Sequence, residues 1–300
     1  MNKWQLFEEA KRRFEAGENV SAAMKDGLSG DDKRLLIEAV YDLQAGSYSE
    51  TYFGGAQPDY EAYVAALIDG ILKDLGVEEV LDCGIGEATR WVAKGGKAKY
   101  HLHGFDISLS RLSFARRNLV KAGVRHDLFT ADMFHIPVAD NAAECVITMH
   151  AMEPNGGMEE RIIAELLRVA GRYLVVMEPD FQKAGAEQKE RMQRLGYVTE
   201  VFPLLEGRED LVIHRYEPVE LFTNPLNRAS ILVAEKKAPA PRAFAFVSPI
   251  SGATLEQRNG FLYDTASGFA FAELDGIPIL KPSDAVFLGH PEAHFGHRDG

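Results

Sequence analysis

Cysteine is almost missing from this chain of 300 residues, which contains only Cys83 and Cys145. Each lies inside an apolar run typical of a β-strand, so the sequence favours two buried thiols over a disulfide framework or an all-cysteine metal site. Apolar runs long enough to cross a bilayer are missing too. Residues 1–16 are rich in charge and lack the apolar core of a signal peptide. These absences predict a cytoplasmic protein without membrane contact.

Positive charge is also scarce, because 33 Lys and Arg residues face 45 Asp and Glu residues and leave a net charge of −12. A protein that grips a phosphate backbone usually has a basic face, but here the basic residues form isolated pairs such as Arg12 with Arg13. The charge therefore disfavours a nucleic-acid partner. Hydrophobic residues make up 46% of the chain, enough for the core of one large domain or two smaller ones.

Short apolar runs alternate with amphipathic segments through the middle of the chain. The expected strands are residues 77–83, 100–105, 126–130, 143–149 and 172–177. The expected helices are residues 4–16, 31–43, 58–76, 108–122, 158–170 and 187–196. This alternation predicts an α/β fold, in which a parallel sheet carries helices on both faces. Residues 210–216 and 229–234 are strands without a helix between them and predict an antiparallel pair that closes the sheet.

Three acidic residues stand at the ends of successive expected strands: Asp82, Asp106 and Asp132. Gly84 and Gly86 follow the first strand and predict a tight turn, where backbone N–H groups come close to a ligand. An acid at the end of the second strand can accept both ribose hydroxyl protons of an adenosine. Since the carboxyl ends of parallel strands meet at one crevice, we expect a cofactor that contains a nucleoside to bind there.

The glycine turn does not match the fingerprint of a dinucleotide-binding protein. That fingerprint, G-x-G-x-x-G, requires a glycine where Thr89 stands. Asp82 precedes the turn, where it would repel a pyrophosphate but could hold a cationic amino group. A nicotinamide enzyme is therefore disfavoured as an alternative.

The segments VLDCGIGEA, GFDIS and TADMFHIP occur in this order, and with them the chain resembles the class I S-adenosylmethionine-dependent methyltransferases of the small-molecule type. The resemblance covers about residues 40–235. It implies a Rossmann-like seven-stranded methyltransferase sheet with S-adenosylmethionine as cofactor. By this resemblance Gly84 and Gly86 approach the methionine part, Asp82 lies close by, and Asp106 binds the ribose.

The resemblance implies further cofactor contacts. Asp132 matches the residue that hydrogen-bonds the adenine amino group, and Met133 and Met149 lie beside the cofactor at the ends of their strands. Ahead of the sheet, YDLQAGSYSETYF is similar to a Tyr-rich entry segment that folds over the cofactor as a lid. The lid residues expected to contact the cofactor are Tyr41, Gln44 and Tyr48. Ordinary packing at a helix end is the alternative reading of these three residues.

The loop MHAMEPNGG, after the fourth strand, is where a methyl acceptor should approach. Methyl transfer is an in-line displacement, and a general base is needed when the acceptor is a hydroxyl that keeps its proton. His150 is the candidate base, since the ordinary pKa of histidine, about 6.5, suits this role. Glu153 is the alternative base or an acceptor ligand, and Asn155 could orient the acceptor. A structural role for His150 is also open.

These residues suit a small polar acceptor, such as the hydroxyl of a sugar or a related metabolite. Enzymes that methylate amino groups of nucleic-acid bases usually carry an Asn/Asp-Pro-Pro-aromatic motif here, and this chain lacks it. His214 and the NPLN segment, residues 224–227, are weaker candidates for the acceptor pocket. The alternative is a non-catalytic methyltransferase fold that docks a partner through its C-terminal segment.

A charged, Pro- and Ala-rich linker, KKAPAPR at residues 236–242, predicts a domain boundary. We expect N-terminal helices and a lid in residues 1–57, the cofactor-binding domain in 58–236, and a small mainly-β module in 243–285. The module resembles a zinc ribbon in which Ser248, Ser251, Asp264 and Ser267 replace the cysteines. Serine hydroxyls are poor zinc ligands, so no metal is expected.

The last residues, 286–300, are expected to be irregular. Their histidines, His290, His294 and His297, have spacings compatible with metal binding, but scattered solvent-exposed side chains are the preferred interpretation. The module is also the expected place for contact with a second copy of the chain or with a partner protein.

Overall fold

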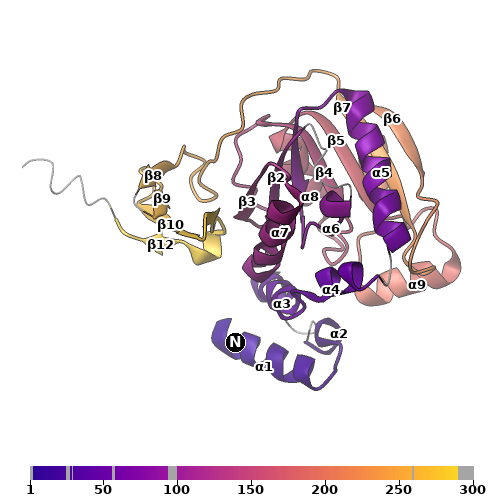
Figure 1. Cartoon of the computed structure of the whole chain (residues 1–300), viewed down its shortest axis with the longest axis horizontal. Coiled ribbons are helices and arrows are strands. Elements are labelled where there is room, and N and C mark those ends of the chain that lie inside the picture. Colours follow the sequence, from indigo (N-terminus) through magenta and orange to yellow (C-terminus); the bar gives the residue numbers. More distant parts are fainter. Residues whose placement is uncertain are drawn as a thin grey trace, which may run out of the picture.

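The computed structural model describes residues 3–24, 28, 30–55, 58–93, 100–258 and 260–289. Its centre is a seven-stranded sheet (Figure 1). The strands are β1 (Glu79–Cys83), β2 (His101–Asp106), β3 (His126–Thr130), β4 (Ala143–Met149), β5 (Ala170–Pro179), β6 (Leu211–Pro218) and β7 (Ala229–Lys236). They lie in the order β3-β2-β1-β4-β5-β7-β6, in which β1 to β5 are parallel and β7 runs antiparallel to both of its neighbours. The predicted α/β fold and its antiparallel closing pair are confirmed.

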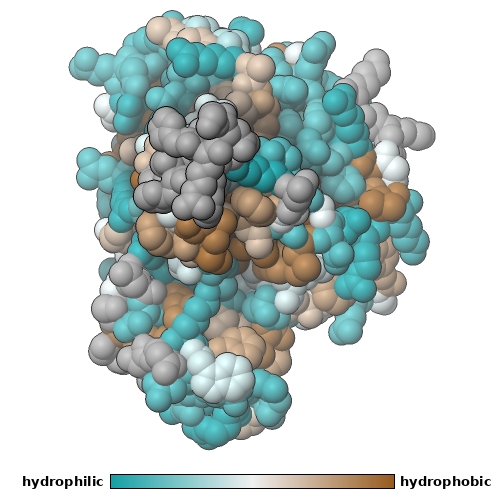
Figure 2. All heavy atoms as spheres, turned by 90° about the vertical axis from the view of Figure 1, so that its left-hand side faces the viewer, coloured by the Kyte–Doolittle hydropathy of each residue, from teal (hydrophilic) through white to brown (hydrophobic). Residues whose placement is uncertain are grey.

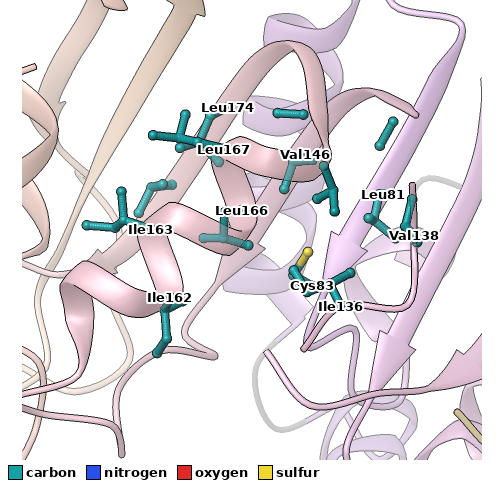
Figure 3. Close-up of a cluster of buried hydrophobic side chains, with 14 of the residues drawn as sticks. Leu81, Cys83, Ile136, Val138, Val146, Ile162, Ile163, Leu166, Leu167 and Leu174 are labelled. Carbon is teal, nitrogen blue, oxygen red and sulfur yellow. The ribbon is translucent and has the colours of Figure 1, made fainter. Parts of the chain in front are cut away.

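Helices cover both faces of the sheet, as the alternation of the sequence predicted. One face carries α5 (Pro58–Leu75), α6 (Thr89–Ala93) and α7 (Leu109–Ala122), whose apolar side chains share one core with the strands. The other face carries α8 (Glu159–Val169) and α10 (Val201–Glu206). Helix α9 (Ala186–Leu195) follows β5. Within α8, Ile162, Ile163, Leu166 and Leu167 recur at helical spacing and lie in one buried cluster with Leu81 of β1 (Figure 3).

The N-terminal helices form a small layer of their own at the carboxyl edge of the sheet (Figure 1). They are α1 (Lys3–Glu15), α2 (Val20–Met24), α3 (Gly30–Leu43) and α4 (Ser47–Phe53). The short helices α2, α4 and α10 were not predicted, because one or two turns give too few residues for a periodic apolar pattern. Helix α4 lies inside the Tyr-rich segment that was expected to act as a lid.

The C-terminal module, which we define as residues 243–289, lies beside β3 (Figure 1). It contains β8 (Glu256–Arg258), β9 (Phe261–Tyr263), β10 (Phe269–Leu274), β11 (Ile277–Pro278), a 3₁₀ turn (Pro282–Asp284) and β12 (Val286–Phe287). Ile279 forms a parallel bridge with Thr130 of β3, and the N–H of Leu280 donates to the carbonyl oxygen of Thr130 over 3.1 Å. The module therefore covers the exposed edge of β3.

Residues 286–300 were expected to be irregular, and the structure corrects this expectation at its first two residues. Val286 and Phe287 form β12, which pairs with β10 because the module supplies a free strand edge that the local sequence does not reveal. His290, His294 and His297 lie outside the described residues. Figure 2 looks onto the side where the module lies and shows apolar surface among charged side chains; Phe287 and Leu288 are among the module's exposed apolar residues.

Cys83 and Cys145 are both buried and free, as the sequence predicted. Their positions in β1 and β4 explain this state, because each strand lies in the interior of the sheet. No helix in the described part of the chain combines the length and the apolar character that a membrane span requires.

Candidate active site

A cavity of about 560 Å³ lies at the carboxyl ends of the parallel strands, which is a size that accommodates small-molecule ligands. The loops after β1, β2, β3 and β4 form its floor, and α3, α4 and α5 form the opposite wall. The expected cofactor and acceptor residues that line it are Tyr41, Gln44, Tyr48, Gly84, Gly86, Asp106, Asp132, Met133, Met149, His150, Glu153 and Asn155. The fold thus brings together residues that are up to 114 positions apart in the sequence.

The glycine turn after β1 comes very close to the loop after β4. Gly84 has a φ of +87°, and a Cβ atom added there would lie 2.3 Å from the Cβ of Ala151. A larger residue cannot occupy this position without displacing the loop. Ala88, two residues beyond Gly86, also has a positive φ of 57° although it is not glycine. The turn thus leaves its backbone uncovered toward the cavity.

Asp106 connects the glycine turn to the next helix. Its Oδ2 accepts from the N–H of Gly86 over 3.0 Å, and its Oδ1 accepts from the N–H of Ser108 over 2.9 Å. The hydroxyl of Ser108 caps α7 by accepting from the N–H of Arg111, which confirms the predicted helix start. Burial raises the pKa of Asp106, and these N–H donors oppose that rise. The carboxylate therefore lies at the cavity wall in a fixed orientation.

Asp82 is placed differently from the other two acids. It lies beneath the cavity wall and does not line the cavity, so its expected closeness to the methionine part is indirect. Its Oδ2 accepts from the indole N–H of Trp91 over 2.6 Å, and its Oδ1 has no hydrogen-bond partner within the described residues. Burial raises the pKa of Asp82 to about 7.

An arginine that the sequence analysis did not identify lies between the two lid tyrosines. The guanidinium of Arg111 is 4.6 Å from the ring centres of both Tyr41 and Tyr48. Its Nε and Nη2 are buried and have no hydrogen-bond partner in the part of the chain that the structure describes. A sequence signal exists, since Arg111 lies in the first turn of the helix that follows Asp106. The two tyrosines therefore pack across the cavity, where the lid interpretation requires them.

Glu87 fixes the lid to the glycine turn. Its two carboxylate oxygens accept from the N–H groups of Gly46 over 2.9 Å and Ser49 over 2.7 Å, at the start of α4. A carboxylate at this place satisfies N–H groups that a helix leaves unpaired at its N-terminus, and it interacts favourably with the helix dipole. Glu87 directly follows Gly86, so these two hydrogen bonds join the glycine turn to the start of α4.

His150 is held by partners on both sides of its ring. Nδ1 lies 2.6 Å from Oε1 of Glu153, and Nε2 lies 3.2 Å from the hydroxyl of Tyr60 on α5. Asn227 also donates to Oε1 of Glu153 over 2.9 Å. Burial acts to raise the pKa of Glu153, but the hydrogen bonds from His150 and Asn227 and the nearby positive charges together outweigh it, and the pKa lies below its ordinary value. No pattern in the sequence pointed to Tyr60, which is 90 residues from His150.

Glu178, at the end of β5, fixes the backbone around His150. Its Oε1 accepts from the N–H groups of Ala151 and Met152 over 3.0 and 3.1 Å, and from the hydroxyl of Thr148 over 3.0 Å. Burial raises the pKa of Glu178 to about 7. His150 itself has a φ of 55°, a left-handed conformation that is costly for a residue with a side chain. The bonds to Glu178 stabilise the loop next to this strained residue.

The weaker acceptor candidates separate in the structure. Asn224 and Asn227 line the cavity near Glu153 and His150, together with Thr223. His214 does not, because it lies on β6 with Nε2 2.8 Å from Glu235 and outside the cavity lining. The suggestion that His214 lines the acceptor pocket is therefore wrong. His214 lies in β6, which is an edge strand of the sheet. The sequence alone does not show toward which end of the sheet a residue of this strand lies.

Comparison with known proteins agrees with this geometry. Residues 80–172 match the family model described as "Methyltransferase domain". Magnesium protoporphyrin IX methyltransferase from Synechocystis PCC 6803, crystallised with bound SAM, has a similar fold: 14% identity, a TM-score of 0.52, and coverage of 71% of this chain and 100% of that chain. A search of curated proteins found no match.

Two further solved structures share the arrangement more loosely. A putative O-methyltransferase from Klebsiella pneumoniae has 14% identity and a TM-score of 0.43, covering 60% of this chain and 81% of that chain. A SAM dependent methyltransferase from Aquifex aeolicus has 20% identity and a TM-score of 0.41, covering 56% of this chain and 88% of that chain.

Residues 80–172 thus match a methyltransferase domain, and the fold of the chain agrees with that match. The family resemblance seen in the sequence is thereby confirmed, and S-adenosylmethionine is the cofactor of this class. The lining of the cavity fits that molecule, because Asp106, Asp132 and Arg111 offer it charged and polar groups at the strand ends. Buried N–H groups of Arg111, which lines the cavity, remain without protein partners among the described residues. Buried polar groups normally have partners, so this unmet capacity points to a polar ligand.

Proposed function

We propose that this methyltransferase transfers the methyl group of S-adenosylmethionine to a hydroxyl group of a small polar molecule, with His150 as general base. The observation that carries the proposal is the hydrogen-bonded series Glu153–His150–Tyr60, whose free end faces the cavity. Once bound, the cofactor supplies an electrophilic methyl group on a sulfonium. The residues of the chain must then bind the acceptor, orient it and remove its proton.

The partners of His150 support the role of base. Glu153 stays ionised, since its pKa lies below its ordinary value, and it accepts the Nδ1 proton of His150. Nε2 is then the nitrogen with a lone pair, and in the absence of an acceptor it accepts a hydrogen bond from the hydroxyl of Tyr60. An acceptor hydroxyl that displaces or joins Tyr60 would give its proton to Nε2 as its oxygen attacks the methyl carbon. Glu153 would stabilise the imidazolium that forms.

The lining of the cavity near His150 supports a polyhydroxylated acceptor. Asn155, Thr223, Asn224 and Asn227 all line the cavity, and Asn227 bonds Glu153, the partner of His150. Amides and hydroxyls both donate and accept hydrogen bonds, so they match the alternating donors and acceptors of a sugar. Tyr41 and Tyr48 close the opposite wall and would exclude water from the reacting atoms. A sugar or sugar derivative is therefore the acceptor class that we propose.

The test uses His150→Asn, because asparagine tolerates the left-handed backbone at this position. We expect kcat to fall about 100-fold, which is typical for loss of a general base, while the affinity for S-adenosylhomocysteine stays within about twofold. Turnover is followed as formation of S-adenosylhomocysteine with a panel of mono- and oligosaccharides. His214→Asn is the matched control, since His214 also bonds a glutamate but lies outside the cavity.

Two results would contradict the proposal. Near-wild-type turnover of His150→Asn would remove the need for this base and would favour an amine or thiol acceptor that already presents a lone pair. Cofactor binding without turnover of any hydroxylated, amine or thiol compound would favour the alternative, a methyltransferase fold that is retained for binding.

A further inference from the structure

A second group of polar side chains lies at the opposite end of the sheet from the cavity. Glu79 is the first residue of β1, His101 the first of β2, and His103 follows on the same face. One ligand atom from each of these three side chains lies within 4.8 Å of the other two. Asp127 of β3 lies beside the two histidines, with Oδ2 2.7 Å from Nε2 of His101 and 3.5 Å from Nδ1 of His103.

His103 has an environment that the rest of the fold does not explain. His103 is only 4% exposed, yet neither of its ring nitrogens has a hydrogen-bond partner within the described ranges. One ring face stacks on Phe244, with 3.7 Å between ring centres and 4° between ring planes. Stacking covers a face of the imidazole, whereas the nitrogen lone pairs lie in the plane of the ring. Because buried polar atoms rarely stay unpaired, His103 calls for a partner that converges on His101 and Asp127.

We propose that Glu79, His101, His103 and Asp127 form a binding site for a divalent transition-metal ion such as Zn²⁺. Two imidazoles and a carboxylate suit zinc and its neighbours, whereas calcium and magnesium prefer oxygen ligands alone. In a tetrahedral site with bonds of about 2.0–2.1 Å, ligand atoms are roughly 3.3 Å apart. The separations of 2.7 and 3.5 Å around Oδ2 of Asp127 lie on either side of that distance.

The ion would have a structural role, since the site lies at the amino ends of β1 and β2 and the cavity lies at the carboxyl ends. It would join three neighbouring strands, β1, β2 and β3. It would also fix the ring of His103, on which Phe244 of the C-terminal module packs. The sequence predicted no metal because it offers no thiolate cluster, and strand pairing brings the ligands together from residues 48 positions apart.

The experiment measures Zn²⁺ binding to the full chain by competition with a chromogenic chelator, and thermal unfolding with and without Zn²⁺. The background carries alanine at His290, His294 and His297, so that tail histidines do not contribute. His103→Phe keeps an aromatic ring against Phe244, and His101→Gln keeps a donor for Asp127. His126→Gln is the matched control, because His126 lies on β3 but bonds the carbonyl oxygen of Val124 outside the cluster.

We expect one Zn²⁺ per chain, and at an ion concentration about 100-fold above Kd a rise of roughly 5 °C in the unfolding temperature. His103→Phe and His101→Gln should each weaken binding at least about 10-fold and abolish most of the thermal shift, whereas His126→Gln should retain both. The proposal is overturned if the chain binds no Zn²⁺ at millimolar concentration. It is equally overturned if the two ligand variants bind Zn²⁺ like the control.

Discussion

Asp264 in the C-terminal module and Asp82 under the cavity are both buried, but their hydrogen bonding differs completely. The carboxylate of Asp264 accepts from the hydroxyls of Ser251, over 2.7 Å, and Ser267, and from the N–H groups of Ala266 and Ser267. Burial acts to raise its pKa, but the bonds from Ser248, Ser267 and Ser251 outweigh burial and lower the pKa to about 2. Asp82 keeps one oxygen without a partner among the described residues, and burial raises its pKa to about 7.

The difference separates a structural carboxylate from one in a ligand-binding region. In the module, one aspartate and three serines occupy the positions where the sequence resembles a zinc ribbon, and they satisfy one another. Asp82 and Glu178 behind the cavity wall and Arg111 in its lining each keep at least one buried polar atom without a partner within the described residues, and of these three only Arg111 faces a ligand in the cavity. Unmet hydrogen bonding costs stability, so it is tolerable where a ligand completes it. The module therefore needs no ion at these serines.

The strongest test of the comparison is Asp106→Ala. Removal of a charged acceptor that would bind the ribose should weaken S-adenosylhomocysteine binding about 100-fold, because hydrogen bonds to charged groups are worth more than neutral ones. Isothermal titration calorimetry measures this change, with Asp106→Asn as a variant that keeps the side-chain shape. Asp140→Ala is the control, since Asp140 is exposed and pairs with Arg168 outside the cavity. Unchanged affinity in Asp106→Ala would contradict the prediction that this cavity binds the cofactor.

The corresponding change in the module is Asp264→Asn. It removes the charge that three hydroxyls surround, and should lower the free energy of unfolding by roughly 2 kcal/mol, with cofactor affinity changed by less than about threefold. Because the folded pKa is lowered to about 2, this stability is present above an unfolded pKa of about 4 and is lost as the pH falls toward 2. Thermal unfolding measured between pH 7 and pH 3 checks both the loss of stability in the variant and the pH dependence of the wild type. Equal loss of stability from wild type and variant at low pH would contradict the prediction.

The two regions meet at Lys281, which is 4% exposed. Its Nζ lies 2.6 Å from Glu38 of α3 and 2.9 Å from Asp284, and it donates to the carbonyl oxygen of Ile107 over 3.2 Å. Ile107 follows Asp106 and lines the cavity, and α3 carries Tyr41. Lys281 therefore connects the loop after β2 with α3.

The smallest effect is expected from Lys281→Met, which keeps the length of the side chain and removes its charge. We expect about fivefold weaker S-adenosylhomocysteine binding, in the range of coupling through packed networks, with kcat at saturating cofactor within about twofold. Lys3→Met is the matched control, because Lys3 also pairs with Asp284 but has no hydrogen bond or ion pair with Ile107 or Glu38 among the described residues. Rescue by Lys281→Arg would support positioning, whereas equal effects of the Lys281 and Lys3 substitutions would exclude it.

Several parts of the fold could be predicted because their signals are local. The predicted strand 126–130 and helix 108–122 agree with β3 and α7 within one residue, since a cap or a run of apolar residues marks each end. The glycine turn and the strand-end acids were recognisable because sheet topology requires them at fixed places in the chain. The cavity confirms that these groups meet at one edge, and their binding role stays a prediction.

By itself, the sequence determined the α/β fold, the closing antiparallel pair and the family, because each depends on periodicity or on short motifs. Only the tertiary structure decided which side chains complete the site. Tyr60 reaches His150 across 90 residues, and Lys281 reaches Glu38 across 243 residues. The tertiary structure also decided that Asp82 lies under the cavity wall and that His214 lies outside the cavity lining. The physical reason is that side-chain direction and long-range contact follow from how helices pack on the sheet, and no local pattern encodes that packing.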